Sequence, residues 1–579
     1  MKINISRLSA VIALILPGLV SCVTINEELG DNFIPEDKIW NVFPCESVTL
    51  EDITMKQSDK LSGYSTSRIT FGSIKDGEFG CDKSSSFTLV PLMREIDFGT
   101  DPRVLQFHFT ALRDTVSTLG DGDKRMLQNV YIHTLKQPLD STILYAGTFT
   151  DKAKLDEYVD FEYGTITKGI PVYNGGDSLS FDFSDAYATK VIEGIQRWQE
   201  LEKEKRDSLA YYLKEVPGIY ISTDHQTADG GRINMFDLPL AASDGYLDAN
   251  YAELKIRSKY DEVEKDTLFI FYFGPSEFLK DDATSYPSQY AFNSSDNYAG
   301  EDFFDSWENS DRSSIYVEGG SGYKPVIKAA EIKRIVDGLI AEKASEFDKK
   351  SIVINRATIL LPYNVGTSYG LLDKYPQILS PTVRLVSDDD KYVTYAGLTD
   401  SSIESENQGD INRSLSTYMP DVSHHVQEIV KLERGVGEDI DPNETEEEFE
   451  ERLSKYDIWF LIMHEEVTES SSSSSAYDDY YNSLMYNSYY NNMMYDPYGY
   501  GYGYGYGGYG YGYSDYYGYN NYYNYYMMAQ YANASSSSTS TSSIELDRDR
   551  FYNAKLNGPG ATENRPSLKI TFSAPHKSE

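Results

Sequence analysis

The feature that most constrains the fold is a series of short β-rich runs separated by glycine, aspartate and proline clusters. In the first third of the chain these runs lie at 67–71, 86–92, 104–112 and 129–135. Short strands at this spacing, with turn residues between them, predict an antiparallel sandwich or barrel rather than alternating β–α–β units. We therefore expect a mainly β protein with two antiparallel β-sandwich (jelly-roll-like) domains and a few covering or connecting helices.

The middle of the chain changes from strand to helix periodicity and back. Apolar residues recur at helical spacing through 186–217, where Ser184 or Asp185 supplies an N-cap and Pro217-Gly218 ends the helix. The next two runs, 219–221 and 233–236, predict two strands joined as a hairpin, and the run at 266–273 predicts a buried central strand. The other predicted elements are helices at 326–347 and 426–432, a surface helix or disordered spur at 444–453, and strands at 352–361, 382–386, 457–463 and 568–572.

The length of the chain and the turn residues between its segments together predict the domain organisation. The chain has 579 residues, enough for three or four domains of about 150 residues each. The predicted segments are a leader at 1–21, a tether with a first strand at 22–60, an N-terminal β-sandwich at 61–185, a connecting helix at 186–217, a second β-sandwich at 218–470, a Ser/Tyr/Gly-rich insertion at 471–543 and a closing strand of the second domain at 544–579.

The insertion is unlike the rest of the chain. Gly499 to Tyr513 is almost strict Gly-Tyr alternation, and serine tracts flank the Tyr-rich stretch on both sides. Such low-complexity sequence is of the disordered, self-associating kind. It is either an adhesive loop or an insertion tolerated at a surface loop, because the entropy cost of closing a loop grows only slowly with its length.

The first 22 residues have the layout of a secretory leader. Lys2 and Arg7 precede an apolar run from Leu8 to Val20, and that run is too short to cross a bilayer, which takes roughly 20 residues. Leu19-Val20-Ser21-Cys22 resembles the bacterial lipoprotein box, in which the cysteine is lipidated and becomes the first mature residue. The sequence therefore predicts palmitate or a similar acyl group on Cys22; the alternative is an ordinary signal peptide in which Cys22 occurs by chance.

The net charge excludes some classes of binding partner, and the cysteine content bears on a disulfide. The formal net charge of −39 at pH 7 argues against nucleic-acid binding, because such a chain repels phosphate backbones. It also repels anionic membrane surfaces, so membrane attachment must come from the lipid. Apart from Cys22, the chain has Cys45 and Cys81, which either form a disulfide in an oxidising compartment or remain two buried thiols.

Motifs that carry chemistry are incomplete in this sequence. His464-Glu465-Glu466 begins like a zincin helix, but Thr468 stands where the second histidine is needed. His425 and Glu428 lie three residues apart without an identifiable further ligand, so a surface helix face is the better interpretation. Gly319 to Tyr323 differs from a nucleophile elbow at its last position and predicts a glycine-rich turn.

The sequence patterns expected for metal and cofactor sites are also incomplete or missing. The acidic runs Asp388–Asp390 and Asp121–Asp123 lack the loop spacing of a calcium-binding EF-hand, and there is no Cys-x-x-Cys pair. We therefore predict no catalytic residue, no metal site and no cofactor.

Several short motifs nevertheless recur in the order found in a known family. The chain resembles the Bacteroidota lipoproteins grouped as a domain of unknown function, family 4270. Apart from the lipoprotein box and the acidic start, the resemblance is carried by Leu61-Ser62-Gly63-Tyr64 to Phe79-Gly80, Pro217-Gly218-Ile219-Tyr220-Ile221, Ile354-Asn355-Arg356-Ala357 and Arg565-Pro566-Ser567-Leu568. It implies an envelope lipoprotein of the outer membrane and transfers no catalytic residues. Whether the protein faces the periplasm or the cell surface stays open.

These features together predict a non-enzymatic lipoprotein that acts as a binding or scaffolding module, with envelope proteins or glycans as partners. One alternative is a secreted glycan-active hydrolase on a β-sandwich scaffold, which requires two carboxyl groups about 5 to 9.5 Å apart. Another is an accessory subunit of outer-membrane assembly or transport.

Overall fold

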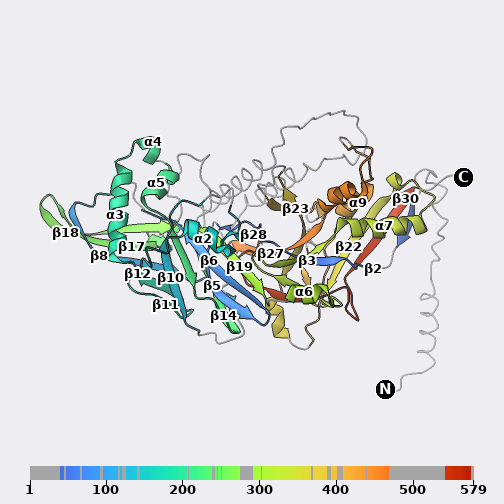
Figure 1. The fold of residues 1–579 in the computed structure, drawn as a ribbon, viewed down its shortest axis with the longest axis horizontal. Helices are drawn as coiled ribbons and strands as arrows, with labels where there is room; N and C mark the ends of the chain where they lie inside the picture. The colour runs from blue at the N-terminus through green and yellow to red at the C-terminus, as the bar shows by residue number, and fades with distance from the viewer. Residues whose placement is uncertain are drawn as a thin grey trace, which may run out of the picture.

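The chain folds mainly into antiparallel β-sheets. The computed structural model describes residues 40–44, 47–65, 68–91, 95–114, 118–119, 126–139, 144–206, 208–237, 241–243, 246–248, 251–273, 291–300, 303–366, 369–387, 393–400, 409–437, 440–468 and 541–575. Among these residues, every strand pair within the sheets is antiparallel and the helices are few, so the predicted fold class is confirmed. The sheets form two halves along the longest axis of the molecule (Figure 1).

The N-terminal half is a sandwich of two sheets around one apolar core. Phe107 and Phe109 of the smaller sheet pack with Phe71 and Phe87 of the larger sheet in this core. The smaller sheet contains, in order, β12 (Ser178–Asp182), β8 (Thr100–Leu112), β17 (Tyr251–Tyr260), β18 (Val263–Phe273) and β7 (Leu89–Pro91). The larger sheet contains, in order, β11 (Val172–Tyr173), β10 (Gln128–Thr134), β13 (Ile219–Thr223), β6 (Phe79–Phe87), β5 (Arg68–Asp76), β14 (Gly230–Asp237) and β9 (Thr118–Leu119), with β19 (Ala291–Ala299) along the other edge of β6 and β4 (Tyr64–Ser65) beside β19. A separate short hairpin consists of β15 (Ala241–Ser243) and β16 (Tyr246–Asp248).

The larger sheet divides at β6, where β5 and β13 pair with different ends of the same edge. At Gly72 the backbone adopts φ +148°, and a Cβ there would lie 2.1 Å from the carbonyl oxygen of Arg232. Side chains bridge the division: Gln128 Nε2 donates to the Arg232 carbonyl at 2.9 Å, and Asn234 Nδ2 donates to Gln128 Oε1 at 2.8 Å. The buried guanidinium of Arg232 also donates to Gln128 Oε1, so this charged group forms hydrogen bonds within the sheet.

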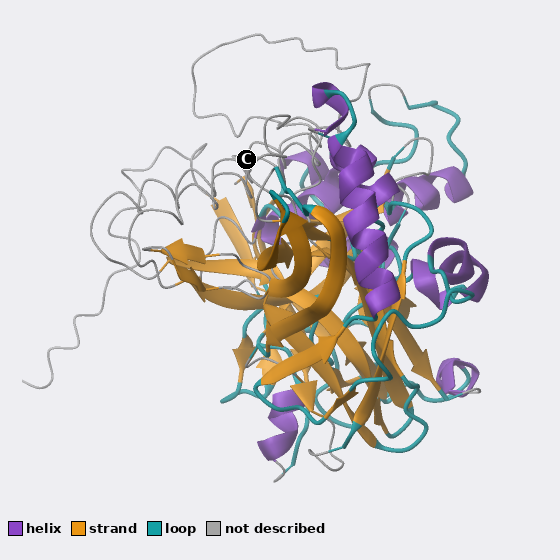
Figure 2. Ribbon diagram, turned by 90° about the vertical axis from the view of Figure 1, so that its left-hand side faces the viewer, coloured by secondary structure: helices purple, strands orange, loops and turns teal. Residues whose placement is uncertain are grey.

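Helices cover one side of the N-terminal half, as the view onto that end of the molecule shows (Figure 2). The predicted connecting helix at 186–217 is instead three helices, α3 (Asp185–Gln199), α4 (Lys203–Arg206) and α5 (Leu209–Glu215). Ser184 caps α3 as predicted, accepting from Tyr187 N. α4 buries no side chain, whereas α5 returns so that Tyr212 packs on Trp198, because the charged stretch between α3 and α5 has almost nothing to bury. Two further short helices, η4 (Thr148–Thr150) and α2 (Lys152–Tyr158), cover the larger sheet near β19.

The C-terminal half contains two six-stranded sheets and the remaining helices. The first sheet has the order β1 (Trp40–Pro44), β30 (Ser567–Pro575), β22 (Val353–Pro362), β26 (Thr417–Tyr418) and β25 (Ile411–Asn412), with β2 (Val48–Thr49) also on β30. The second has the order β24 (Val393–Gly397), β23 (Ile378–Val386), β27 (Ile458–Thr468), β21 (Tyr323–Ile327) and β3 (Ile53–Gln57), with β28 (Thr541–Leu546) on β27. β20 (Ser314–Glu318) pairs with β29 (Asn553–Asn557), and the helices are α6 (Phe303–Glu308), α7 (Ala329–Lys343), η6 (Lys349–Ser351), η7 (Tyr369–Lys374), α9 (Ser423–Lys431) and α10 (Glu446–Ser454).

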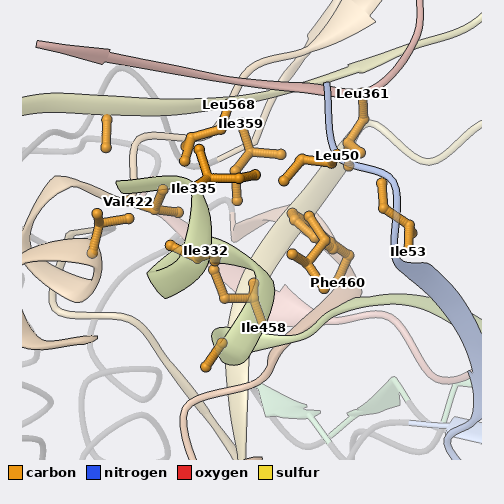
Figure 3. Packing of buried hydrophobic residues seen from close by; sticks show 14 of the residues in the cluster. Leu50, Ile53, Ile332, Ile335, Ile359, Leu361, Val422, Ile458, Phe460 and Leu568 are labelled. Carbon is orange, nitrogen blue, oxygen red and sulfur yellow. The ribbon is translucent and has the colours of Figure 1, made fainter. Parts of the chain in front are cut away.

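The core of the C-terminal half joins α7 and α9 to both of its sheets. Ile332 and Ile335 of α7 share this core with Ile359 of β22 and Leu568 of β30, and Ile335 lies beside both strands in the close view (Figure 3). Leu50 and Ile53, near the start of the described chain, are fully buried in the same core. The described part of the segment predicted as tether and first strand, which contains β1, β2 and β3, therefore belongs to the C-terminal half.

The sheets divide the chain differently from the boundary predicted at residue 218. β13, β14, β17, β18 and β19 all pair within the N-terminal half, so that half extends to residue 299. The predicted hairpin of 219–221 with 233–236 is wrong, because β6 and β5 lie between β13 and β14. The short sequence separation favoured a direct pairing of β13 with β14. In the structure β13 pairs with β6 and β14 pairs with β5, so the β5–β6 hairpin lies between them.

The predicted buried central strand at 266–273 is also corrected. β18 pairs with β7 only through Phe271 to Phe273, and its outer part extends beyond that neighbour. Val263 and Leu268 are accordingly 55% and 44% exposed, while Phe271 is fully buried. An apolar run therefore marked a projecting hairpin strand, anchored at one end.

The Tyr-rich insertion lies outside the described residues, but the strands that flank it are described. β27 and β28 pair with each other from Met463↔Leu546 to Thr468↔Thr541. Residues 541–543, which were predicted to belong to the insertion, are the start of β28. The insertion therefore connects two neighbouring strands of one sheet, as a hairpin loop does.

Candidate functional site: the polar junction between the halves

Many buried polar groups lie where the two halves meet. Cys81, Lys83, Asn293, Ser295 and Asn297 share one face of the paired strands β6 and β19. Opposite them lie the turn between β20 and β21 and the segment after β28. We call this cluster the polar junction; its members from the C-terminal half are Glu318, Ser321, Lys324, Asp547, Arg548 and Asp549.

Lys324 is a buried ammonium that the turn between β20 and β21 surrounds with backbone oxygens. Its Nζ atom donates to the carbonyl oxygens of Gly320 at 3.2 Å and Gly322 at 3.1 Å, and also to that of Glu318. Three carbonyls match the three donors of an ammonium group. Burial lowers the pKa of Lys324 and raises the pKa of the neighbouring Glu318 carboxyl, which accepts from Tyr323 N at 3.0 Å. The glycine-rich turn predicted at this position is confirmed, and its function here is to enclose a charge.

Several hydrogen bonds cross the polar junction. Lys83 Nζ donates to the Arg548 carbonyl at 2.5 Å, Asn293 Nδ2 donates to Asp549 Oδ1 at 3.2 Å, and Ser321 donates to the Ser295 carbonyl. Outside the cluster, Asp76 of β5 accepts from Lys374 Nζ at 2.8 Å and from Asn553 Nδ2 at 3.0 Å. These contacts join residues from most of the chain, so the two halves are held together by polar as well as apolar groups.

Asp547 is the best-satisfied carboxylate of the polar junction. It accepts from the Tyr552 hydroxyl at 2.7 Å and from Arg550 N at 3.1 Å, and Arg550 Nη1 lies 3.6 Å away. Burial alone would raise the pKa of Asp547, but nearby His464, Arg550 and the Tyr552 hydroxyl lower it below its usual value. The carboxyl is therefore held ionised as a structural group.

The nucleophiles of the polar junction are not activated. Ser295 donates to Asn297 Oδ1 at 2.8 Å, and an amide oxygen does not act as a general base. Burial raises the pKa of the Cys81 thiol to about 12, and a thiol in that state is a poor nucleophile. The cluster fixes the relation between the halves and does not form a catalytic constellation.

A second cluster lies on the opposite face of β6. Asp82 accepts from the Ser73 hydroxyl at 2.5 Å and lies 2.6 Å from Nδ1 of His225, which is half exposed. The serine bonds to the aspartate rather than to the histidine, so the three residues do not form a Ser-His-Asp triad. Asp296 is the partner of Asp82 on β19, and burial together with the charge of Asp82 raises the pKa of Asp296.

The predicted site residues are divided between described and undescribed parts of the chain. Cys22 and Cys45 lie outside the described residues. Cys81 is a buried free thiol on β6, 3.5 Å from Ser295 Oγ. Its pairing with Cys45 therefore stays a prediction.

The two neighbouring histidines of α9 form hydrogen bonds that hold the helix in place. The His425 ring nitrogen Nε2 lies 2.8 Å from the Tyr456 carbonyl, and burial lowers its pKa to about 4. The main-chain amides of His424 and His425 donate to the carboxylate of Asp400, which thus caps the helix. Lys324 and Glu318 were not predicted from the sequence, where their only signal is a pair of opposite charges flanking a glycine-rich turn between apolar strands.

No three His, Cys, Asp or Glu side chains in the described ranges come close enough together to hold a metal ion. None of the helices formed by those residues combines the length and apolar character that crossing a bilayer requires. Comparison with known proteins gives no relative: no family model, no curated protein and no solved structure matches this chain.

Proposed function

We propose that this chain is a non-enzymatic lipoprotein of the bacterial cell envelope, anchored in the outer membrane by lipid on Cys22. It acts as a binding or scaffolding module for envelope proteins or glycans. The observation that carries the proposal is the position of β1. This strand lies within the segment predicted as tether, after the predicted leader, and it pairs with β30 in the C-terminal half. Its partner β30 lies at one end of the molecule, and β17 and β18 lie toward the other (Figure 1), so an anchor on Cys22 would hold the molecule by the end opposite β17 and β18.

The polar junction supports a scaffolding role. Buried hydrogen bonds between the halves resist relative motion, because breaking one leaves a polar group buried without a partner. A rigid joint would hold the loops and exposed strands of the N-terminal half at a fixed distance from the lipid. Loops carried on a rigid sandwich commonly form binding surfaces.

The anchor and the partner are tested separately. Wild-type protein should label with palmitate and fractionate with outer membranes, whereas Cys22→Ser should do neither; a Cys22→Ser protein that still labels would overturn the anchor. Partners should be captured by cross-linking tagged protein in intact envelopes and identifying what is bound. Val263→Ser/Leu268→Ser should reduce that capture at unchanged melting temperature, because both side chains are exposed on the far hairpin.

The glycan-active hydrolase remains the second candidate, and the pairing of Asp82 with Asp296 is the observation that favours it. Directly opposite residues on neighbouring strands have Cβ atoms about 5 Å apart, and the pair would need one protonated and one ionised carboxyl group. Here Asp82 is held by Ser73 and His225, and both carboxylates lie side by side on one sheet. Release of reducing sugar from envelope glycans, lost in Asp82→Asn and in Asp296→Asn, would favour this candidate over the binding module.

A further inference from the structure

The outer face of the sheet that begins with β1 carries a row of exposed apolar side chains. Trp40 and Val42 of β1 are 46% and 57% exposed, and Val353 of β22 is 44% exposed. Val42 and Val353 are both partners of Ser573 on β30, so the three residues lie on the same face of adjacent strands. Their inward-facing neighbours Phe43 and Phe572 stack in the core at 5.2 Å. We call Trp40, Val42 and Val353 the anchor-side patch.

Charge on this face differs from that of the whole protein. Lys569 and Arg356 are exposed on the same face, although the chain carries a formal net charge of −39. Asp421 lies 3.7 Å from Arg356 but is itself buried. This basic and apolar face suits an anionic or zwitterionic lipid surface, whereas a two-fold contact with the same face of a second copy would bring Lys569 and Arg356 close to the same cations of that copy.

The short distance along the chain between Cys22 and the anchor-side patch indicates that a lipid surface covers the patch. Residues 23–39 separate Cys22 from Trp40, and at about 3.5 Å per extended residue they allow the body to move up to roughly 60 Å from the lipid. Tryptophan prefers the interface between water and lipid, where its ring is buried and its N–H stays wet. We propose that the anchor-side patch docks onto the lipid surface that holds Cys22, and that this contact sets the orientation of the protein. The inference rests on the lipid anchor proposed above.

The tryptophans make the contact measurable. Trp198, Trp307 and Trp459 are only 1%, 8% and 7% exposed, so a quencher within the lipid reaches Trp40 first. Lipidated full-length protein is reconstituted into vesicles of phosphatidylethanolamine and phosphatidylglycerol with and without brominated acyl chains. We expect brominated lipid to quench part of the tryptophan emission, and we expect Trp40→Phe to remove that part while the protein stays on the vesicles.

The variants separate docking from anchoring. Val42→Ser/Val353→Ser should lower the quenching of Trp40 at least about twofold, because the apolar contact beside it is lost. The matched control Leu112→Ser/Leu127→Ser removes two exposed leucines of the N-terminal half, 54% and 66% exposed, and should change nothing. Wild-type protein that sits on vesicles without quenching overturns docking alone. A blue shift of Trp40 that depends on protein concentration without lipid indicates a second copy and also overturns it. Protein that does not join vesicles at all contradicts the anchor instead.

Discussion

Lys83 Nζ donates a hydrogen bond to the main-chain carbonyl oxygen of Arg548, 2.5 Å away, and joins residues 465 positions apart in the sequence. The bond links the second strand of a hairpin in the N-terminal half to the segment that follows β28 in the C-terminal half. No local sequence pattern relates the two residues. The position of Arg548 depends on β27 and β28 pairing across the whole Tyr-rich insertion.

We expect Lys83→Met to destabilise the protein by about 1–3 kcal/mol, because it removes a part-buried hydrogen bond that an ionised side chain donates across the polar junction. The matched control is Lys75→Met on the neighbouring strand, whose Nζ donates to the Thr227 carbonyl at an exposed site. That variant should stay within about 0.5 kcal/mol of wild type. Urea unfolding followed by circular dichroism measures both, and equal effects of the two substitutions would contradict the role assigned to Lys83.

Lys324→Met should cost more, about 3–5 kcal/mol, since it removes the hydrogen bonds to three buried backbone carbonyls and the basic group beside the buried Glu318 carboxyl. Glu318→Gln should cost less, because an amide oxygen can still accept from Tyr323 N. In the double variant the two costs should not add, which a double-mutant cycle of unfolding free energies detects. Strict additivity would show that the two side chains act independently.

Burial of His425 predicts a pH dependence of stability. Its pKa is lowered to about 4 in the folded protein, below the ordinary value of 6.5, so the unfolded chain binds more protons between these values. The contribution of His425 is complete above pH 6.5 and is lost as the pH falls toward 4, amounting to about 3 kcal/mol. His425→Gln, which keeps a donor for the Tyr456 carbonyl, should flatten this slope.

The neighbouring Asp400 changes the pH dependence of stability in the direction opposite to that of His425. Burial raises its pKa to about 6, so its contribution declines as the pH rises from about 4 to 6. The comparison of wild type with His425→Gln at each pH therefore isolates the histidine. An unchanged slope in His425→Gln would show that the ring is not the titrating group.

Deleting Tyr477 to Tyr531 should leave the fold intact, because the insertion connects strands that already pair with each other. Each halving of a loop changes the closure free energy by only about 0.6 kcal/mol. Thermal melting is the measurement. A drop of more than roughly 10 °C, beyond what about 1 kcal/mol gives a domain of this size, would mean that the deleted residues contribute to a core.

The sequence by itself determined the class of the fold and many of its local elements. Turn residues between short β-rich runs predicted the antiparallel sheets, and Ser184 predicted the start of α3, because strand alternation and helix capping depend on residues close together in the chain. The glycine-rich turn before Tyr323 was predicted for the same reason. Its function in holding Lys324 was not, since that depends on which side chains the turn surrounds.

Only the tertiary structure decided which strands are neighbours. β13 and β14 follow each other in sequence, yet β6 and β5 lie between them, and β1 pairs with the last strand of the chain. Those choices follow from which apolar faces cover each other, a property of the assembled sheets that periodicity within one segment does not encode. The polar junction has the same origin. Its lysines, asparagines and aspartates are ordinary in the sequence and become buried partners only after the two halves meet.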